Sequence, residues 1–229
     1  GPFYGAVVAC ADDPNLAAVL PRMTRRVTTY GLDTTDADLT ATDVALGPLT
    51  VHATVKRRAR RSDDPAKTPA TLGPLMLHVP GRHNLLNALA AVCVGMELGL
   101  PFERIAVGLR EFRGAERRFE VRGEPNGILV VDDYGHHPTE IAAVLAAARA
   151  LNRRIIVAFQ PHRYTRTAAL MDAFGPSLGG ADHIVLTDIY AASEDPIAGV
   201  TIEALADAIR RSVSAPVEVV GRLDEVVPA

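Results

Sequence analysis

The sequence contains no tryptophan and only two cysteines, and aromatic residues make up 5% of its 229 positions. So few aromatic side chains argue against a surface that stacks nucleobases, and a net charge of -3 argues against binding nucleic acid through a basic surface. Cys10 and Cys93 lie in apolar stretches, which favours buried free thiols over a disulfide and is compatible with a reducing compartment.

Long hydrophobic segments and the common cofactor motifs are also lacking. No apolar run is long enough to span a bilayer and no basic-then-apolar leader opens the chain, so we expect a cytoplasmic protein without a membrane span. There is no Gly-Lys-Ser/Thr phosphate loop, no Gly-x-Gly-x-x-Gly fingerprint and no cysteine and histidine spacing typical of zinc. Hydride transfer and structural zinc are therefore unsupported. A Gly-x-Ser-x-Gly match at 175–179 falls where a helix should end, so we interpret it as a chance match.

What is present is a regular succession of apolar segments. Hydrophobic periodicity predicts strands at 6–10, 26–31, 49–55, 75–79, 119–122, 128–131, 154–159, 183–190 and 216–220, and helices at 15–20, 80–92, 102–112, 141–149, 168–178, 201–212 and 223–227.

These segments predict two α/β domains, residues 1–114 and 115–229. The first carries an antiparallel appendage within residues 38–78, in which the basic run 56–61 is interpreted as a solvated hairpin edge or loop and not as a phosphate site. The second has the strand and helix alternation of a Rossmann-like, doubly wound and mostly parallel sheet.

The densest polar cluster is the turn Asp132-Asp133-Tyr134-Gly135-His136-His137-Pro138-Thr139-Glu140. It follows the run at 128–131, expected to be a buried strand, and precedes a helix, which is where open α/β sheets bind ligands. A capped turn with solvated charges would explain a lone Asp or His. Two carboxylates, a phenol and two imidazoles within the six residues 132–137 favour a functional site instead.

A second polar turn, His162-Arg163-Tyr164-Thr165-Arg166, follows the strand predicted at 154–159. If that strand is parallel to the one at 128–131, both turns lie at the same end of the sheet. Cations on one loop beside carboxylates and imidazoles on the next suit a site that binds an anion and orients a nucleophile.

Two amides and two arginines are further candidates. Asn84 and Asn87 project from one face of the first turn of a helix. They could read the edge of a purine, or one could cap the helix while the other is solvated, and the spacing alone does not decide. Arg117 and Arg118 lie at the domain junction, where they could be solvated or could clamp a phosphate.

Four motifs together carry a resemblance to a known family. Gly81-Arg82-His83-Asn84 with Asn87, Arg117-Arg118-Phe119, the turn at 132–140, and Phe159-Gln160-Pro161-His162-Arg163-Tyr164-Thr165-Arg166-Thr167 resemble the alanine-adding members of the Mur ligase family of bacterial cell-wall enzymes. The resemblance implies a three-domain, ATP-dependent ligase, in which residues 1–114 are the back half of the central ATP-binding domain and 115–229 the C-terminal Rossmann-like domain. In this family the carboxylate of UDP-N-acetylmuramate is converted with ATP and Mg²⁺ into an acyl phosphate, which L-alanine attacks.

The resemblance also implies roles for residues that bind the nucleotide. By position, Asn84 and Asn87 would contact the adenine of ATP, while Arg118 and Asp133 would hold its ribose or phosphates. No metal ligand is assigned to this chain.

Further roles concern the amino-acid substrate. Tyr134, His136, Arg163 and Arg166 would lie near the acyl phosphate and the incoming alanine, with the arginines pairing with its carboxylate. The resemblance therefore makes His136, Asp133 and Arg118 the expected catalytic residues. His136 has a usable intrinsic pKa for accepting the amine proton, although orientation of the substrate would also explain its presence.

The sequence departs from the family in what it omits. The Gly-rich phosphate loop, the carboxylate that holds magnesium and the UDP-binding domain of the family would precede Gly1. We therefore expect the 229-residue chain alone to be inactive as a ligase and to bind nucleotide weakly at best. The alternative, from another functional class, is a non-catalytic module that binds a nucleotide or a protein partner through the same crevice.

Overall fold

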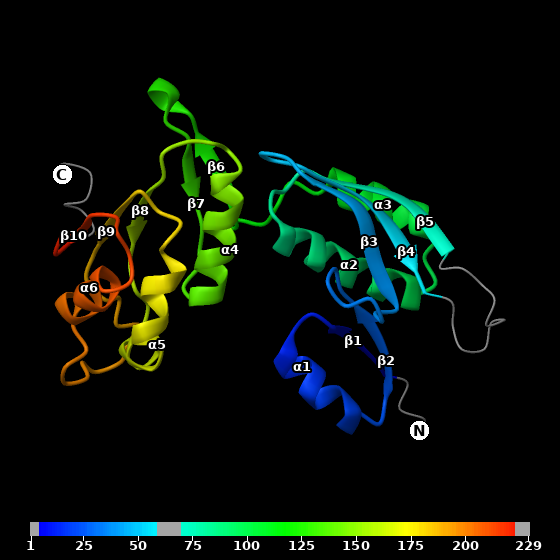
Figure 1. Ribbon diagram of the computed structural model, residues 1–229, viewed down its shortest axis with the longest axis horizontal. Helices are drawn as coiled ribbons and strands as arrows, with labels where there is room; N and C mark the ends of the chain where they lie inside the picture. Colours follow the sequence, from blue (N-terminus) through cyan, green and yellow to red (C-terminus); the bar gives the residue numbers. More distant parts are fainter. Residues whose placement is uncertain (1–4, 59–69, 223–229) are drawn as a thin grey trace. The chain divides into compact units, whose positions relative to one another are not determined.

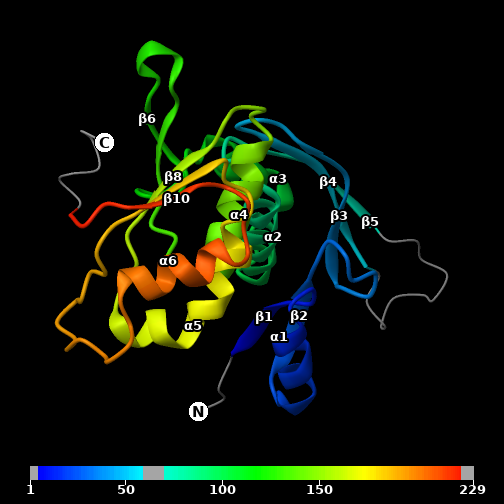
Figure 2. The same ribbon diagram turned by 60° about the vertical axis from the view of Figure 1, so that its left-hand side comes forward.

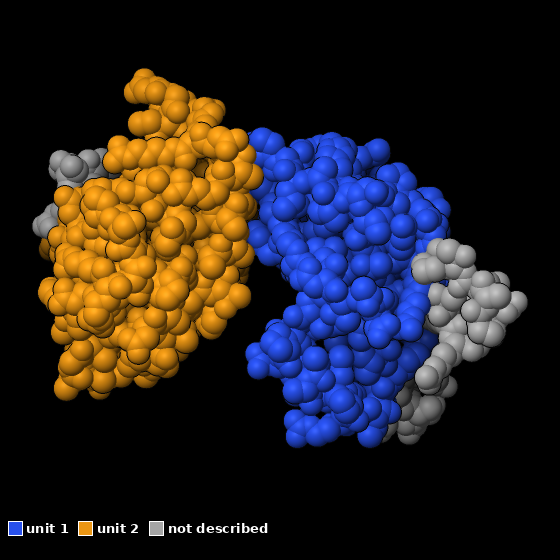
Figure 3. Space-filling view, in the orientation of Figure 1, with its two compact units in different colours: residues 1–115 blue, residues 116–229 orange. Residues whose placement is uncertain are grey.

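The computed structural model describes residues 5–58 and 70–222. The end of the basic run, the polar stretch at 62–69 and the helix predicted at 223–227 lie outside the described residues. The chain divides into two compact units, residues 1–115 and 116–229 (Figure 3), where the sequence predicted a boundary after residue 114. None of the helices in the described ranges is long and apolar enough to cross a membrane.

The first unit is built on one five-stranded sheet in the order β1-β2-β3-β4-β5 (Figure 1). Its elements are β1 (Ala6–Cys10), α1 (Pro14–Val19), a 3₁₀ turn (Leu20–Arg22), β2 (Arg26–Tyr30), β3 (Leu39–Leu46), β4 (Val51–Arg57), β5 (Ala70–Leu77), α2 (Arg82–Glu97) and α3 (Phe102–Glu111). β1, β2 and β3 pair in parallel, and β3, β4 and β5 pair antiparallel.

The antiparallel strands form part of this sheet, whereas the sequence predicted an appendage beside it. Tyr30 of β2 pairs with Leu39 of β3, a strand that the periodicity missed. The physical reason is a shared core: α2 buries Leu85 and Leu89 against alternate side chains of the antiparallel strands, including Val55. Helix α2 packs on β1, β2 and β3, and α3 packs on β5, so both kinds of strand pairing share one core and belong to one layer.

The start of α2 is fastened to the end of β1 through Asp12. The Asp12 carboxylate accepts hydrogen bonds from the backbone N–H of Leu32 at 2.7 Å and of Thr34 at 2.9 Å. Arg82, the first residue of α2, has its Nη2 3.7 Å from Asp12 Oδ2. Gly31 lies against the same carboxylate, where a Cβ would come within 2.5 Å of Asp12 Oδ1.

The two cysteines are free thiols, as the sequence predicted. Cys93 is buried on α2 within the first core, and burial raises the pKa of its thiol to about 12. Cys10 on β1 is only partly buried.

The second unit contains a three-stranded parallel sheet in the order β10-β9-β8 and a separate antiparallel pair, β6 and β7. Its elements are β6 (Glu120–Gly123), a 3₁₀ turn (Pro125–Gly127), β7 (Val130–Asp132), α4 (Pro138–Arg149), β8 (Ile156–Phe159), α5 (Tyr164–Ser177), β9 (His183–Leu186), α6 (Ile202–Arg210) and β10 (Val217–Val219). Figures 1 and 2 show α5 and α6 side by side, and the alternation of strand and helix predicted from the sequence is confirmed.

The strand that leads into the polar turn at 132–140 is not buried as predicted. Ile128 is 66% exposed and Val130 of β7 is 43% exposed. β7 forms its ladder with β6, not with β8, and a two-stranded ribbon leaves more of its side chains accessible than an inner strand of a sheet. The apolar run was therefore correctly predicted as a strand but wrongly placed in the core.

The core of this unit joins helices α4, α5 and α6 to the parallel strands. Phe174, Ile184 and Leu205 are almost fully buried there. Ser177, from the Gly-x-Ser-x-Gly match, is also buried, and its hydroxyl donates to Phe174 O at 2.8 Å inside α5. A buried helical serine cannot act as an exposed nucleophile, so the match is a chance one.

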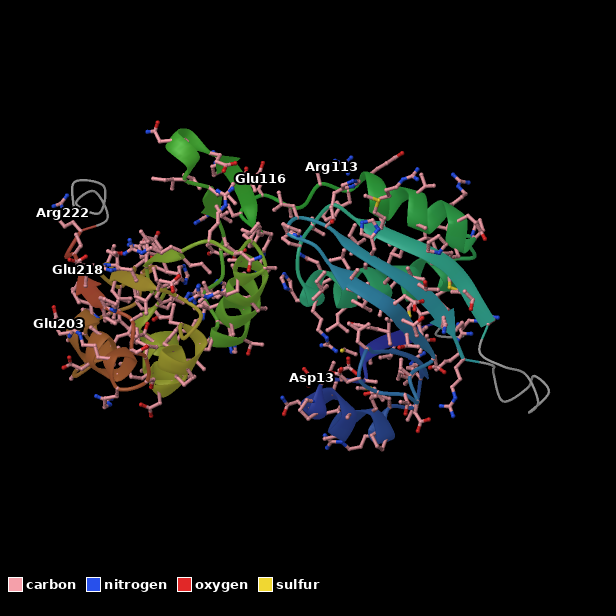
Figure 4. The ribbon with its side chains drawn as sticks, turned by 45° about the horizontal axis from the view of Figure 1, so that its top comes forward. Asp13, Arg113, Glu116, Glu203, Glu218 and Arg222 are labelled. Carbon is pink, nitrogen blue, oxygen red and sulfur yellow. The ribbon has the colours of Figure 1, made fainter. Side chains whose placement is uncertain are left out.

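Charged residues lie at the surface of the second unit. Glu203 occupies the first turn of α6, where a negative charge suits the helix dipole. Glu218 of β10 is also labelled in Figure 4, and its carboxylate lies 3.2 Å from His183 Nε2 on the neighbouring strand β9.

Candidate anion-binding site of the second unit

The two polar turns of the second unit meet, as the sequence predicted. The ring of His162, in the loop after β8, lies 5.9 Å from the ring of His136 and 6.3 Å from that of Tyr134, in the loop after β7. Tyr134 and His136 themselves pack edge to face at 5.0 Å. β7 does not belong to the parallel sheet, but the two loops still converge. Their contact is made by aromatic and imidazole rings that lie after the ends of β7 and β8.

Asp133 shapes the first of these turns through its backbone contacts. Its Oδ2 accepts from the N–H of Phe119 at 2.7 Å and its Oδ1 from the N–H of Gly135 at 2.6 Å. A Cβ at position 135 would lie 2.9 Å from Asp133 Oδ1, so glycine permits this close approach. Both carboxylate oxygens thus bind the protein backbone.

Glu140 closes the turn at the start of α4. Its Oε2 accepts from the N–H groups of His136 at 3.2 Å and His137 at 3.3 Å, in a capping box with the His137 side chain. Arg118 Nη1 donates to Oε1 at 3.4 Å. Burial alone would raise the pKa of Glu140, but these two N–H groups and Arg118 hold it below its usual value. Pro138 and Glu140 occupy the first turn of α4, which begins three residues before the helix predicted at 141–149.

The imidazole of His136 has a defined orientation. Its Nδ1 lies 2.8 Å from the carbonyl oxygen of Tyr134, so Nδ1 carries the proton and donates. In the neutral ring Nε2 is then the acceptor. Arg117 stacks over the Tyr134 ring at 4.7 Å, and its Nε is 3.6 Å from Asp132.

The second turn presents two arginines. Arg166 Nη1 lies 3.2 Å from His162 Nδ1, and Arg163 Nη1 lies 3.8 Å from Glu194. Partial burial, followed by the charges of Arg166 and Arg163, lowers the pKa of His162. A neutral His162 accepts at Nδ1 and therefore orients the Arg166 guanidinium.

These contacts define the chemistry that the site can perform. Guanidinium groups of Arg163 and Arg166 can pair with a carboxylate or phosphate, and the His136 imidazole can accept a proton at Nε2. Arg118 adds a third positive charge, balanced in part by Glu140. The arrangement suits an anionic substrate that carries a group to be deprotonated.

Asn84 and Asn87 belong to the first unit, at the start of α2. Asn84 Nδ2 donates to Pro80 O at 2.7 Å, and Asn87 Nδ2 donates weakly to Asn84 Oδ1 at 3.4 Å. The two amides therefore share one face of the helix, as their spacing predicted. Neither amide caps the helix, because the N-cap of α2 is Gly81 and no side-chain capping bond is made there, so that alternative is wrong. Asn84 donates to the backbone, while the exposed amide of Asn87 has more capacity for a ligand.

No metal centre is formed within residues 5–58 and 70–222. These ranges contain no group of three or more His, Cys, Asp or Glu side chains that could hold a metal ion.

Two contributors to the site were missed by the sequence reasoning. Tyr190 stacks on His162 with ring centroids 5.4 Å apart, and Glu194 binds the first turn of α5. The periodicity placed Tyr190 in a strand and Glu194 in a plain loop. Their position after the next parallel strand was the available signal, since loops after neighbouring parallel strands meet at one edge.

Comparison with known proteins supports a common origin for the whole chain. A family model described as Mur ligase, glutamate ligase domain, matches residues 117–229. The UDP-N-acetylmuramate--L-alanine ligase of Solibacter usitatus is 50% identical over 229 residues, which is 100% of this chain and 46% of that protein. The enzyme of the same name from Geobacter sp. strain M21 is 50% identical over 92% of this chain and 44% of its own length.

Solved structures agree with the fold. The UDP-N-acetylmuramate-alanine ligase MurC of Thermotoga maritima is 28% identical with a TM-score of 0.72, over 98% of this chain and 45% of that one. The MurF ligase of Thermotoga maritima, solved in complex with ADP, has a TM-score of 0.67 at 19% identity, over 98% of this chain and 46% of that one, and so shows the fold alone.

The chain spans less than half the length of the curated relatives that it matches. Within that span the similarity to the Solibacter usitatus protein extends over the whole of this chain. Identity of 50% over the entire chain, a matching family model for the second unit and a shared fold have one explanation: the chain belongs to the Mur ligase family.

Proposed function

We propose that this chain contributes to an ATP-dependent ligase that forms the C–N bond between L-alanine and UDP-N-acetylmuramate, in the cytoplasmic stage of peptidoglycan synthesis. The observation that carries the proposal is the cluster of His136, His162 and Arg166, formed by two converging loops, with Arg163 in the second of these loops. It occurs in a chain that is 50% identical to proteins named for this reaction.

Arg163, which precedes α5, and Arg166, in its first turn, bind the carboxylate of the amino acid in this proposal. Arg163 is 49% exposed and pairs with Glu194 only at 3.8 Å, so its guanidinium has donors left for a substrate. Arg166 is held by His162. Two guanidinium groups neutralise the charge of a carboxylate that lies between them, and their hydrogen bonds also fix its orientation.

His136 accepts the proton from the amine that attacks. Its Nδ1 donates to Tyr134 O, so Nε2 carries the lone pair in the neutral ring. An ammonium group must lose a proton before its nitrogen can act as a nucleophile, and Nε2 of the neutral imidazole can accept that proton. Tyr134, packed on His136, forms the wall of this part of the site.

Asn84 and Asn87 contact the adenine of ATP, and Arg118 approaches the phosphates. The exposed amide of Asn87 suits a purine edge better than the amide of Asn84, which already binds Pro80 O. Asp133 acts by holding the turn in shape, because both of its oxygens accept backbone N–H groups. ATP with Mg²⁺ supplies the phosphoryl group that activates the substrate carboxylate.

The two units correspond in this proposal to two parts of a Mur ligase. Residues 1–114 are the back half of the central ATP-binding domain, and residues 115–229 are the C-terminal ligase domain. The match of the family model to residues 117–229 supports the second assignment.

Phosphate release tests the proposal. The natural gene product that contains this chain should release phosphate from ATP only with magnesium, alanine and UDP-N-acetylmuramate together, whereas the 229-residue chain alone should release none. Clear release by the chain alone would contradict its expected inactivity. Nucleotide binding by the natural gene product without any turnover would favour the non-catalytic module instead.

A variant pair sharpens this test. Arg166→Ala should lower kcat/KM for alanine by about 100-fold, because it removes one of two guanidinium groups from the carboxylate. Arg210→Ala is the matched control, since Arg210 on α6 pairs at the surface with Asp207 at 3.0 Å. Its kinetics should be those of the wild type, and equal losses in both variants would contradict the assigned role.

A further inference from the structure

A single carboxylate from the loop after β9 holds the first turn of α5. Glu194 Oε2 accepts from the backbone N–H of Thr165 at 3.0 Å, and Oε1 accepts from the Thr165 hydroxyl at 2.8 Å. Glu194 Oε1 is also 3.8 Å from Arg163 Nη1. The contacts are therefore made within the turn that presents Arg163 and Arg166.

The helix has no other such support of its own. Arg163, the residue that precedes α5, makes no side-chain capping bond, and the first turn of α5 contains no acidic residue. A helix amino terminus is stabilised by an acceptor and by negative charge. Glu194 supplies both from a distant part of the chain. The N–H and hydroxyl of Thr165, with the charge of Arg163, lower the pKa of Glu194, so this carboxylate is ionised.

The backbone on both sides of this contact is strained. Arg163 has φ 74, Ala192 has φ 49 and Ser193 has φ 69, all in the left-handed region that residues with a Cβ avoid. Such conformations persist where surrounding contacts over-determine them, and they concentrate at functional sites. Here the N–H of Arg163 donates to Tyr190 O and the N–H of Tyr190 donates to Pro161 O, each at 2.8 Å.

We propose that Glu194 positions Arg163 and Arg166 for the carboxylate of the amino-acid substrate, so that amino-acid affinity depends on it while nucleotide affinity does not. The path is short: Glu194 fixes Thr165, and Thr165 lies between the two arginines at the start of α5. The inference rests on the proposed function. Glu194 is a positioning residue, because it acts through the arginines.

Steady-state kinetics of the natural gene product test this role. Glu194→Ala should raise KM for alanine by about 10-fold, with kcat within about threefold and KM for ATP unchanged, since it removes charge-assisted hydrogen bonds that hold the turn. Glu194→Gln keeps one oxygen acceptor for Thr165 and should raise KM for alanine by less than Glu194→Ala does. The Gln variant also keeps the test valid if the Glu194→Ala variant folds poorly.

Asp182→Asn is the matched control. Asp182 is a carboxylate of the same unit that accepts from the N–H of Ile155 at 2.7 Å and pairs with Arg149 at 2.8 Å. Its replacement should lower stability without changing KM for alanine.

The outcomes separate two failures. An active wild type with an unchanged alanine KM in both Glu194 variants would overturn this proposal alone, as would an equal rise in Asp182→Asn. A wild type whose turnover does not depend on alanine would overturn the proposed function, and the positioning role with it.

Discussion

Thr187, directly after β9, carries a buried hydroxyl whose removal should stabilise the second unit. The residue is 1% exposed, and its Oγ1 has no hydrogen-bond partner among the residues that the structure describes. Valine keeps the branched shape and replaces the hydroxyl with a methyl. Removing an unsatisfied buried hydroxyl raises the free energy of unfolding by about 1–3 kcal/mol, and burying a methyl group in its place adds about 0.8 kcal/mol. Steric crowding by the larger methyl group partly offsets this gain. We expect Thr187→Val to raise the free energy of unfolding by about 1–2 kcal/mol.

Thr167 provides the matched comparison. It is 0% exposed on α5, and its hydroxyl donates to Arg163 O at 2.8 Å. That carbonyl also accepts from the N–H of Thr167 at 3.0 Å, so it stays satisfied when the hydroxyl is removed. In Thr167→Val, loss of the hydrogen bond lowers the free energy of unfolding by about 1 kcal/mol, and burial of the methyl group raises it by about 0.8 kcal/mol. The net change should therefore be close to zero.

Urea titrations followed by circular dichroism would measure both variants against the wild type. Hydrogen exchange of the β8 and β9 peptides would assign the change to the second unit. Thr187→Val should be the more stable variant by about 1 kcal/mol or more. If the two variants change equally, or if Thr187→Val is destabilised, the Thr187 hydroxyl has a partner and the reasoning is refuted.

Three further predictions concern single sites. Cys93 should resist iodoacetamide at pH 8 until urea is added, because a thiol of pKa about 12 is only about one part in ten thousand thiolate at that pH, as mass spectrometry would show. Gly31→Ala should lower the free energy of unfolding by about 1–3 kcal/mol by pushing a Cβ against Asp12, whereas Gly108→Ala, in open space on α3, should raise it by about 0.5–1 kcal/mol. Glu140 has a lowered folded pKa, so its stabilisation is present above the usual value of 4.5 and is lost as the pH falls through the folded pKa. Glu140→Gln should therefore lose less stability than the wild type between pH 5 and pH 3, measured by urea titration at each pH, and a parallel loss would contradict the assignment.

Much of the fold could be predicted because local patterns carry it. The 3.6-residue spacing of apolar side chains on α2 and the apolar runs of β1, β8 and β9 identify these elements without tertiary information. β3 was missed because its second half is exposed and a bulge between Thr42 and Ala45 interrupts its alternation.

The site was predictable in composition but not in detail. The sequence alone determined which chemical groups are present: the imidazoles, guanidinium groups and carboxylates of two turns that follow strands, since strand and turn formation depend on nearby residues. Only the tertiary structure decided what each group does. It committed Asp133 to the backbone, turned His136 Nε2 into the acceptor, and brought Glu194 to Thr165 across 29 positions of sequence. Such pairings depend on how helices and strands pack, and packing energy comes from contacts between residues that are distant in the chain.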